Sequence, residues 1–240
     1  MKQISLIILS LFDYFHKTKI INFIKKKFYK INILIDVGAH HGESVQLFAK
    51  NFKTNSIYSF EPSLENFQKL LSNVRHLVKK KFFNFHAYNL GLGSKEEKLN
   101  LNVPRETSSS TINSINKESN YYKKKNKFLG EANKDFFYKK EVVKIVTLDS
   151  IMKKKIFDVV DLIKIDTEGF EYEVLQGSKE VLKKTRLVLF EHHYDSMLLK
   201  GYTFKQVHHF LILNNFKKVF KAKMPFRKTF DYIYENTNKL

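Results

Sequence analysis

Polar residues follow several short apolar runs in this chain, and their types suit both ligand binding and acid–base chemistry. They are Asp36, Glu61, Asn89, Asp166 with Glu168, and Glu191 with His192. Carboxylates accept hydrogen bonds from ribose hydroxyls, and an Asn side chain offers a donor and an acceptor to an adenine edge. Carboxylates and imidazoles can also take the proton of a hydroxyl. If the apolar runs are neighbouring parallel strands, these side chains converge at one edge of a sheet.

The element that positions the first of these residues is the stretch at 31–44, I-N-I-L-I-D-V-G-A-H-H-G-E-S. Its β-branched run at 33–35 predicts a strand buried on both faces of a parallel sheet. Gly38 and Gly42 flank a tight turn in which the backbone can approach a ligand closely. Apolar residues at helical spacing predict a helix over 43–52. A strand, a glycine turn and a helix form the nucleotide-binding corner of a doubly wound α/β sheet.

The glycine turn also restricts the class of ligand. The third glycine of the dinucleotide pattern G-x-G-x-x-G is missing. The pattern D-V-G-A-x-x-G better suits a ligand with one carboxylate and an adenosine, such as S-adenosylmethionine, whose carboxylate can lie near the positive end of a helix dipole. The alternative is a tight turn that binds no ligand. We therefore expect a cofactor site formed by Asp36, Gly38, Gly42, Glu61, Asn89 and Asp166.

Two of these residues have a more specific expected role. Glu61 follows the run at 56–60 and lies about 20 residues beyond the glycine turn, where a carboxylate can bind both ribose hydroxyls. Its alternative is an ordinary helix-capping acid, which Pro62 makes less attractive. Asn89 ends the next predicted strand, at 82–88, and would face the adenine.

The remaining periodicity completes the predicted α/β fold. Further strands are expected over 159–165 and 187–190, and a closing antiparallel hairpin over 216–220 and 230–234. Thr203 and Gln206 have the spacing of a capping box, which predicts a helix through Leu213. The sequence thus predicts a doubly wound, mostly parallel sheet in one domain over 31–240, preceded by an N-terminal helical segment at 1–30.

Two segments depart from this regular pattern. Residues 104–140 are long, polar and poor in periodic apolar residues, which is typical of a functional lid or a disordered loop. We expect a lid that is mobile without ligand and contacts the acceptor. In residues 1–30 the first apolar run is too short to span a bilayer. The basic, amphipathic stretch at 20–28 can lie on a membrane surface, although helices that cover the sheet are the favoured alternative.

The amino-acid composition indicates which cellular compartment and which classes of partner are compatible with the chain. The 240 residues contain no Cys, which excludes disulfides, thiolate metal sites and a cysteine nucleophile, and is compatible with a cytoplasmic enzyme. The formal net charge is +19, but the Lys runs are scattered among connections. We therefore expect no specific nucleic-acid partner, and peripheral contact of the basic N-terminal segment with the inner face of the membrane is the alternative to its packing on the sheet.

Several motifs together resemble the FkbM family of S-adenosylmethionine-dependent methyltransferases. They are D-V-G-A-H-H-G-E-S at 36–44, F-E-P-S-L-E-N-F at 60–67, T-L-D-S-I at 147–151, I-K-I-D-T-E-G-F-E-Y-E-V-L-Q-G at 163–177 and L-V-L-F-E at 187–191. The resemblance covers roughly residues 31–235, with His40 where the family commonly has Asn. It implies the Rossmann-like class I methyltransferase fold and methyl transfer to oxygen, often a sugar or polyketide hydroxyl. We accordingly expect a small-molecule or glycan acceptor.

A hydroxyl acceptor benefits from a general base. We expect Glu168 and the Glu191–His192 pair to hold and deprotonate the acceptor, with His193 as a further candidate, while Asp166 orients the methionine end of the cofactor. Helix capping, or an ion pair with Lys164, is the structural alternative for the two glutamates. A divalent metal held by Asp166, Glu168 and Glu191 ranks below direct base catalysis.

Two other classes of protein remain as alternatives. A nucleic-acid methyltransferase would account for the charge, but an amino-methylating enzyme of that kind usually has an Asp/Asn-Pro-Pro-aromatic block after the fourth strand. This chain has Asp-Thr-Glu-Gly at 166–169. A basic protein that binds RNA or membrane on a methyltransferase-like fold is the second alternative. The acidic strand ends count against it, because they would repel an anion.

Overall fold

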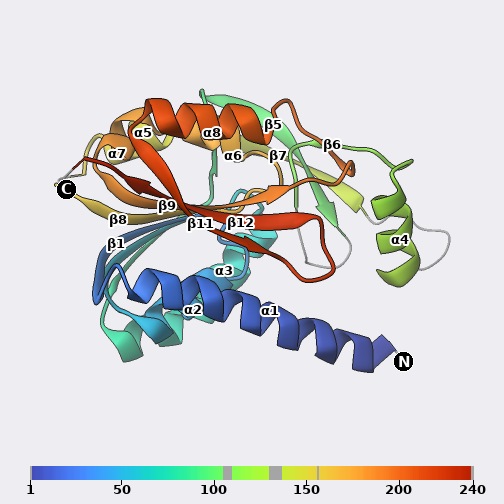
Figure 1. Ribbon diagram of the computed structural model, residues 1–240, viewed down its shortest axis with the longest axis horizontal. Helices are drawn as coiled ribbons and strands as arrows, with labels where there is room; N and C mark the ends of the chain where they lie inside the picture. The colour runs from blue at the N-terminus through green and yellow to red at the C-terminus, as the bar shows by residue number, and fades with distance from the viewer. Residues whose placement is uncertain (1, 105–109, 130–136, 156, 239–240) are drawn as a thin grey trace.

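A computed structural model describes residues 2–104, 110–129, 137–155 and 157–238 (Figure 1). Its central sheet has seven strands in the order β11-β12-β9-β8-β1-β2-β3. Their bounds are β1 Lys30–Val37, β2 Lys53–Phe60, β3 Asn84–Tyr88, β8 Val160–Ile165, β9 Thr185–His193, β11 Phe216–Lys223 and β12 Thr229–Asn236. Neighbours from β3 to β9 are parallel, whereas β12 is antiparallel to both β9 and β11. The predicted doubly wound, mostly parallel sheet with a closing hairpin is confirmed.

The register of the parallel strands aligns the ends from which the predicted site residues extend. Val37 is paired with Phe60 on one side and with Ile165 on the other. Phe60 is paired in turn with Tyr88, and Ile165 with Phe190. The residue after each of these five therefore lies in one row along the carboxyl edge of the sheet. That row consists of Gly38, Glu61, Asn89, Asp166 and Glu191.

Helices cover both faces of the sheet (Figure 1). The first face carries α1 Lys2–Lys25, α2 Glu43–Asn51 and α3 Leu64–Lys81; the second carries α5 Leu148–Met152, α6 Glu171–Gln176, α7 Lys179–Lys183 and α8 Phe204–Leu213. Each layer has its own apolar core, because the buried strands present aliphatic side chains to both sides. The predicted capping box is present: Thr203 and Gln206 satisfy each other's backbone N–H at the start of α8.

The region predicted as a lid contains regular structure. At its boundaries, β5 Glu97–Pro104 and β7 Phe137–Val146 form a small sheet with the preceding β4 Gly91–Leu92. Within it, β6 Ser114–Ile115 pairs with β10 Leu198–Leu199. Helix α4, Asn120–Leu129, was not expected from the sequence. Residues 105–109 and 130–136, which include part of the hydroxyl cluster at 107–111, lie outside the described residues. The mobility of the lid stays a prediction.

Among the residues of helix α1 whose side chains are described, apolar residues are both buried and exposed. Ile20, Ile21 and Ile24 pack into the core on the α2 side of the sheet, as expected for a helix that covers it. Nearer the N-terminus, Phe12 and Phe15 are exposed. Among the described helices, none combines the length and apolar character needed to cross a bilayer. Contact of this segment with a membrane surface remains a prediction.

Candidate active site

A cavity of about 520 Å³ opens at the carboxyl edge of the sheet, within the size range of small-molecule sites. Of the residues predicted to bind a cofactor, Gly38, Glu61 and Asp166 line this cavity. The predicted catalytic carboxylates Glu168 and Glu191 line it as well. The other expected cofactor residues, Asp36, Gly42 and Asn89, lie outside this lining.

Glu61 presents a buried carboxylate whose position is held by backbone donors. The N–H of Ser63 donates to Oε1 at 3.0 Å, and the N–H of His40 donates to Oε2 at 2.9 Å. Burial raises the pKa of Glu61, although these two hydrogen bonds oppose the effect. The Asn66 side chain also donates to this carboxylate, so about one of the four lone-pair sites on its two oxygens remains for a ligand. Glu61 is therefore suited to accept a hydrogen bond from a ligand hydroxyl.

Asn89 supports this arrangement from behind. Its amide nitrogen donates to the carbonyls of Glu61 and Pro62, at 3.0 and 2.9 Å. Adjacent residues 90–92, a Leu-Gly-Leu sequence, line the cavity in its place. In this geometry Asn89 positions the Glu61 turn, and the surface next to it is largely apolar.

A buried ion pair lies at the base of the glycine turn. Lys164 Nζ is 3.2 Å from Asp36 Oδ1 and 3.5 Å from Asp166 Oδ2, and it donates to the Gly38 carbonyl at 3.2 Å. Burial alone would lower the pKa of Lys164, but the charges of Asp36 and Asp166 outweigh it and raise that pKa. Lys164 is therefore charged and ties the ends of β1 and β8 together. Asp36 does not line the cavity, but it forms an ion pair with Lys164, which does.

The two predicted glycines have distinct structural roles. Gly38 has φ +74°, and a Cβ there would lie 1.9 Å from the Asp166 carbonyl oxygen, so only glycine lets the two strand ends approach this closely. Gly42 has φ +92°, and its Cα faces Val74 of α3. Gly42 therefore allows the chain to turn into α2 close to α3. Gly42 has no side chain, so it would affect a ligand only by positioning the backbone of this turn.

Glu168 lies in a turn that its neighbours hold in an uncommon conformation. Its φ is +51° and that of Gly169 is +94°. The buried Glu171 fixes this turn by accepting hydrogen bonds from the Thr167 N–H, the Thr167 hydroxyl and the Gly169 N–H, at 2.9–3.1 Å. From the insertion, Thr111 and Asn113 donate to the Glu168 carbonyl. The second glutamate of the E-G-x-E motif therefore positions the first.

Glu168 and Glu191 meet at one imidazole. His193 Nε2 lies 2.8 Å from Glu191 Oε1 and 3.1 Å from Glu168 Oε2, while Nδ1 faces Asp195 and Thr229. Burial and the charge of Asp166 raise the pKa of Glu191 to about 8, although His193 opposes this rise. Burial disfavours the charged imidazole, but the carboxylates around it raise the pKa of His193. The result is a buried acid–base cluster in which two carboxylates form ion pairs with one imidazole.

The structure places His193, and not the predicted His192, beside Glu168 and Glu191. Successive residues of a strand point to opposite faces of a sheet, and β9 continues through His193. The His192 ring therefore faces the α8 side, where it packs among Tyr194, Tyr202 and Phe204. Burial and the charges of Lys200 and His193 lower the pKa of His192 to about 3, so this ring is a neutral core residue.

Helix α1 contributes a wall that the sequence did not predict. His16 Nε2 lies 2.5 Å from Asp231 Oδ2, and both residues are buried and line the cavity. Asp231 of β12 is paired across the sheet with Glu191. Asp13 of α1 and Arg227, 3.7 Å apart, add a second ion pair at the same wall. Only tertiary structure brings these residues together.

Comparison with known protein families identifies the family to which this chain belongs. A family model described as the methyltransferase FkbM domain matches residues 36–220, which include every predicted site residue. The chain belongs to the FkbM methyltransferase family. This confirms the resemblance seen in the motifs. No curated protein gives a match.

Solved structures of methyltransferases share the fold of this FkbM-family chain. A methyltransferase FkbM from Methylobacillus flagellatus is 16% identical, with a TM-score of 0.56 over 86% of this chain and 43% of that one. This chain thus spans less than half of that relative. The magnesium protoporphyrin IX methyltransferase of Synechocystis, solved with bound SAM, is 7% identical, with a TM-score of 0.53 over 95% of this chain and 81% of that one. A putative rRNA methylase from Clostridium thermocellum is 9% identical, with a TM-score of 0.53 over 94% and 97%.

Proposed function

We propose that this FkbM-family chain is an S-adenosylmethionine-dependent O-methyltransferase that acts on a hydroxyl of a sugar, a glycan or another small secondary metabolite. The observation that carries the proposal is the pair of carboxylates, Glu168 and Glu191, that line the cavity and share the imidazole of His193. Such a cluster is suited to holding a hydroxyl and accepting its proton.

The residues present fit the cofactor. Glu61 offers its remaining acceptor site, on a buried carboxylate, to a ribose hydroxyl. The aliphatic surface at 90–92 suits a flat, apolar base. Asp166 is partly exposed at the cavity wall, where it can meet the charged amino group of the methionine moiety. When bound, S-adenosylmethionine supplies an electrophilic methyl group on a sulfonium.

The chain's own contribution to the reaction is positioning and proton transfer. In-line displacement on a methyl group depends mainly on the alignment of acceptor and donor, so a rigid site supplies most of the rate. Glu168 is held by its turn, and Glu191 lies in a central strand, so both carboxylates have fixed positions. We assign to Glu168 the acceptance of the hydroxyl proton, with Glu191 holding the acceptor and His193 orienting both carboxylates.

Nucleic acid is the competing class of acceptor, because the net charge is +19. The carboxylates proposed to hold the acceptor argue against it. Glu168 and Glu191 line this cavity, and a phosphate placed beside them would be repelled. The small-molecule hydroxyl therefore remains the favoured acceptor.

The test is transfer of label from methyl-labelled S-adenosylmethionine to a panel of glycosides, nucleotide sugars and total RNA. We expect label on a sugar oxygen, identified by mass spectrometry. Glu168→Gln should lower the rate constant by roughly 10²–10⁴, the usual range for a general base, with little change in cofactor affinity. Label in RNA would contradict the assignment, as would loss of wild-type activity on chelation that added Mg²⁺ restores. A lower melting temperature with an unchanged rate would make Glu168 a structural residue.

A further inference from the structure

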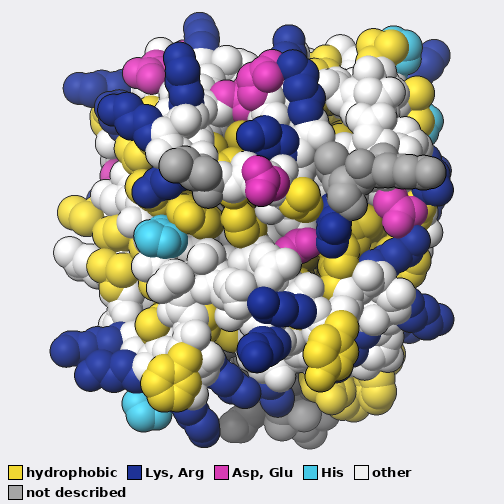
Figure 2. Space-filling model, turned by 90° about the vertical axis from the view of Figure 1, so that its left-hand side faces the viewer, with side chains coloured by type: hydrophobic (Ala, Val, Ile, Leu, Met, Phe, Trp, Pro, Cys, Tyr) yellow, Lys and Arg dark blue, Asp and Glu magenta, His cyan; other side chains and the backbone are white. Residues whose placement is uncertain are grey.

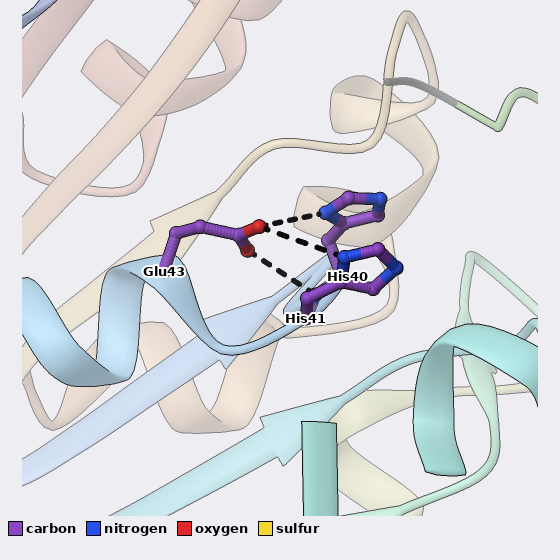
Figure 3. Close-up of side chains that lie close together, drawn as sticks. All are labelled: His40, His41 and Glu43. Carbon is purple, nitrogen blue, oxygen red and sulfur yellow. Dashed lines mark hydrogen bonds and ion pairs between the residues drawn. The ribbon is translucent and has the colours of Figure 1, made fainter. Parts of the chain in front are cut away.

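His40, His41 and Glu43 form a second cluster of titratable side chains, on the turn between β1 and α2 (Figure 3). His40 Nδ1 lies 3.1 Å from Glu43 Oε1, and His41 Nδ1 lies 3.9 Å from the same oxygen. The two imidazole rings are stacked, with centroids 3.7 Å apart. Two ring nitrogens and one carboxylate oxygen therefore face a common point. The reaction proposed above uses none of these side chains.

The turn itself places consecutive histidines on one side. Neighbouring side chains point apart in a regular strand or helix, but His40 has φ +48° and Gly42 has φ +92°. This left-handed turn lets both rings face the first turn of α2, where Glu43 begins the helix. The backbone N–H of His41 also donates to Glu43 Oε2 at 3.2 Å, which fixes the carboxylate. The cluster is thus preorganised by the backbone.

A buried side chain behind the cluster determines which nitrogen of His41 is available. His41 Nε2 lies 3.1 Å from Oδ1 of the buried Asn66. The Asn66 side chain also hydrogen-bonds the Glu61 carboxylate, which can only accept, so its amide nitrogen faces Glu61. The amide oxygen facing His41 is an acceptor, so Nε2 carries the proton. The neutral ring then presents the lone pair of Nδ1 toward Glu43, as in histidine ligands oriented by an outer partner.

The donor set selects a class of ion. Tetrahedral zinc with bonds of about 2.0–2.1 Å places its ligand atoms roughly 3.3–3.5 Å apart. The distances from Glu43 Oε1 to the two Nδ1 atoms, 3.1 and 3.9 Å, lie on either side of this value. Imidazole nitrogens suit Zn²⁺ and neighbouring transition metals, whereas Mg²⁺ and Ca²⁺ prefer oxygen ligands throughout. The chain has no Cys, so no thiolate competes for such an ion.

We propose that His40 Nδ1, His41 Nδ1 and the Glu43 carboxylate bind one divalent transition-metal ion of the Zn²⁺ class. Three protein ligands leave a fourth coordination position open. All three residues line the cavity, so this position is accessible to a small molecule there.

The test uses the whole chain, purified without a polyhistidine tag and stripped with a chelator. Titration with Co²⁺ should give the visible absorption of a tetrahedral ion at one equivalent, and Zn²⁺ should displace it. His41→Asn and Glu43→Gln should each weaken binding by roughly tenfold or more, because losing even an outer partner of a metal ligand typically costs about 10–100-fold. The matched control is His76→Asn on the exposed surface of α3, which should bind Co²⁺ like the wild type.

Among the described residues, Glu168, Glu191 and His193 form a second cluster with metal-ligand geometry. Variants of the two clusters show which of them binds Co²⁺. Retention of the Co²⁺ signal in His193→Asn supports the site on the glycine turn. Loss of the signal in His193→Asn, with retention in Glu43→Gln, overturns it, as does the absence of binding by the wild type at millimolar Co²⁺. Glu43 is largely exposed, so Glu43→Gln keeps the test valid even if His41→Asn fails to fold.

Discussion

His193 contacts both cavity carboxylates, Glu168 and Glu191, through its Nε2. Burial and Asp166 raise the pKa of Glu191 to about 8, and the hydrogen bond and charge of His193 limit that rise. A carboxylate that holds or deprotonates the acceptor works in its ionised form. The rate should therefore be low in acid and rise with pH toward about 8.

His193→Asn removes the contribution that stabilises the ionised Glu191. We expect the rising limb of the pH–rate profile to move to higher pH, because the carboxyl then loses its proton less readily. His192→Asn is the neighbouring control and should leave the midpoint of this limb unchanged. The measurement is kcat against pH for the three proteins. A midpoint that moves in His192→Asn and not in His193→Asn would contradict the assignment.

At this scale the sequence predicted the row of polar residues, because parallel strands end at one edge of a sheet. It did not predict which histidine joins that row. The expected strand ended at Phe190, whereas β9 continues to His193 and alternation then places Glu191 and His193 on the same face. Continuing the strand alternation three residues beyond Phe190 would have placed His193 on the same face as Glu191. The support of Glu168 by Glu171 depends on turn geometry that spacing alone does not reveal.

Helix α1 acts as an element of the site as well as a cover for the sheet. His16 and Asp231, 215 residues apart, form a buried pair that joins α1 to β12 beside Glu191. The sequence predicted the helix from its apolar residues. Its position over the cavity could not be predicted, because one ion pair between distant segments leaves no periodic signal.

His16→Ala should leave the buried Asp231 carboxyl without its partner. We expect a loss of about 1–3 kcal/mol in the free energy of unfolding, the usual cost of an unsatisfied buried polar group. Urea denaturation of the variant and the wild type measures this loss. His209→Ala, on the exposed surface of α8, is the control and should change stability little. Equal midpoints for His16→Ala and the wild type would show that the pair does not stabilise the fold.

The molecule as a whole combines a charge of +19 with an exposed apolar segment on α1. On the face drawn in Figure 2, Lys and Arg side chains are spread among apolar and neutral ones and form no continuous stripe. In α1, Phe12 lies 5.1 Å from the exposed Phe226 of the β11–β12 turn, centroid to centroid. Basic residues and exposed aromatic side chains together are typical of a surface that contacts anionic lipid.

We accordingly expect the chain to bind vesicles that contain phosphatidylglycerol more tightly than neutral phosphatidylcholine vesicles. Added salt should weaken this binding, because exposed charges are screened. Phe12→Ser with Phe15→Ser should reduce it by removing apolar area, whereas Phe82→Ser, at an exposed position after α3, is the matched control. Co-sedimentation measures the bound fraction. Equal binding to both vesicle types would contradict a role for the charge.

The central claim is that the cavity binds S-adenosylmethionine through Glu61, and calorimetry with S-adenosylhomocysteine tests it most directly. We expect micromolar binding to the wild type at one molecule per chain. Glu61→Gln keeps the size of the side chain and removes its charge, so affinity should fall by about 1–3 kcal/mol, the range for a charge-assisted hydrogen bond. No binding to the wild type at millimolar ligand would contradict the account, and unchanged affinity in Glu61→Gln would remove the role assigned to this carboxylate.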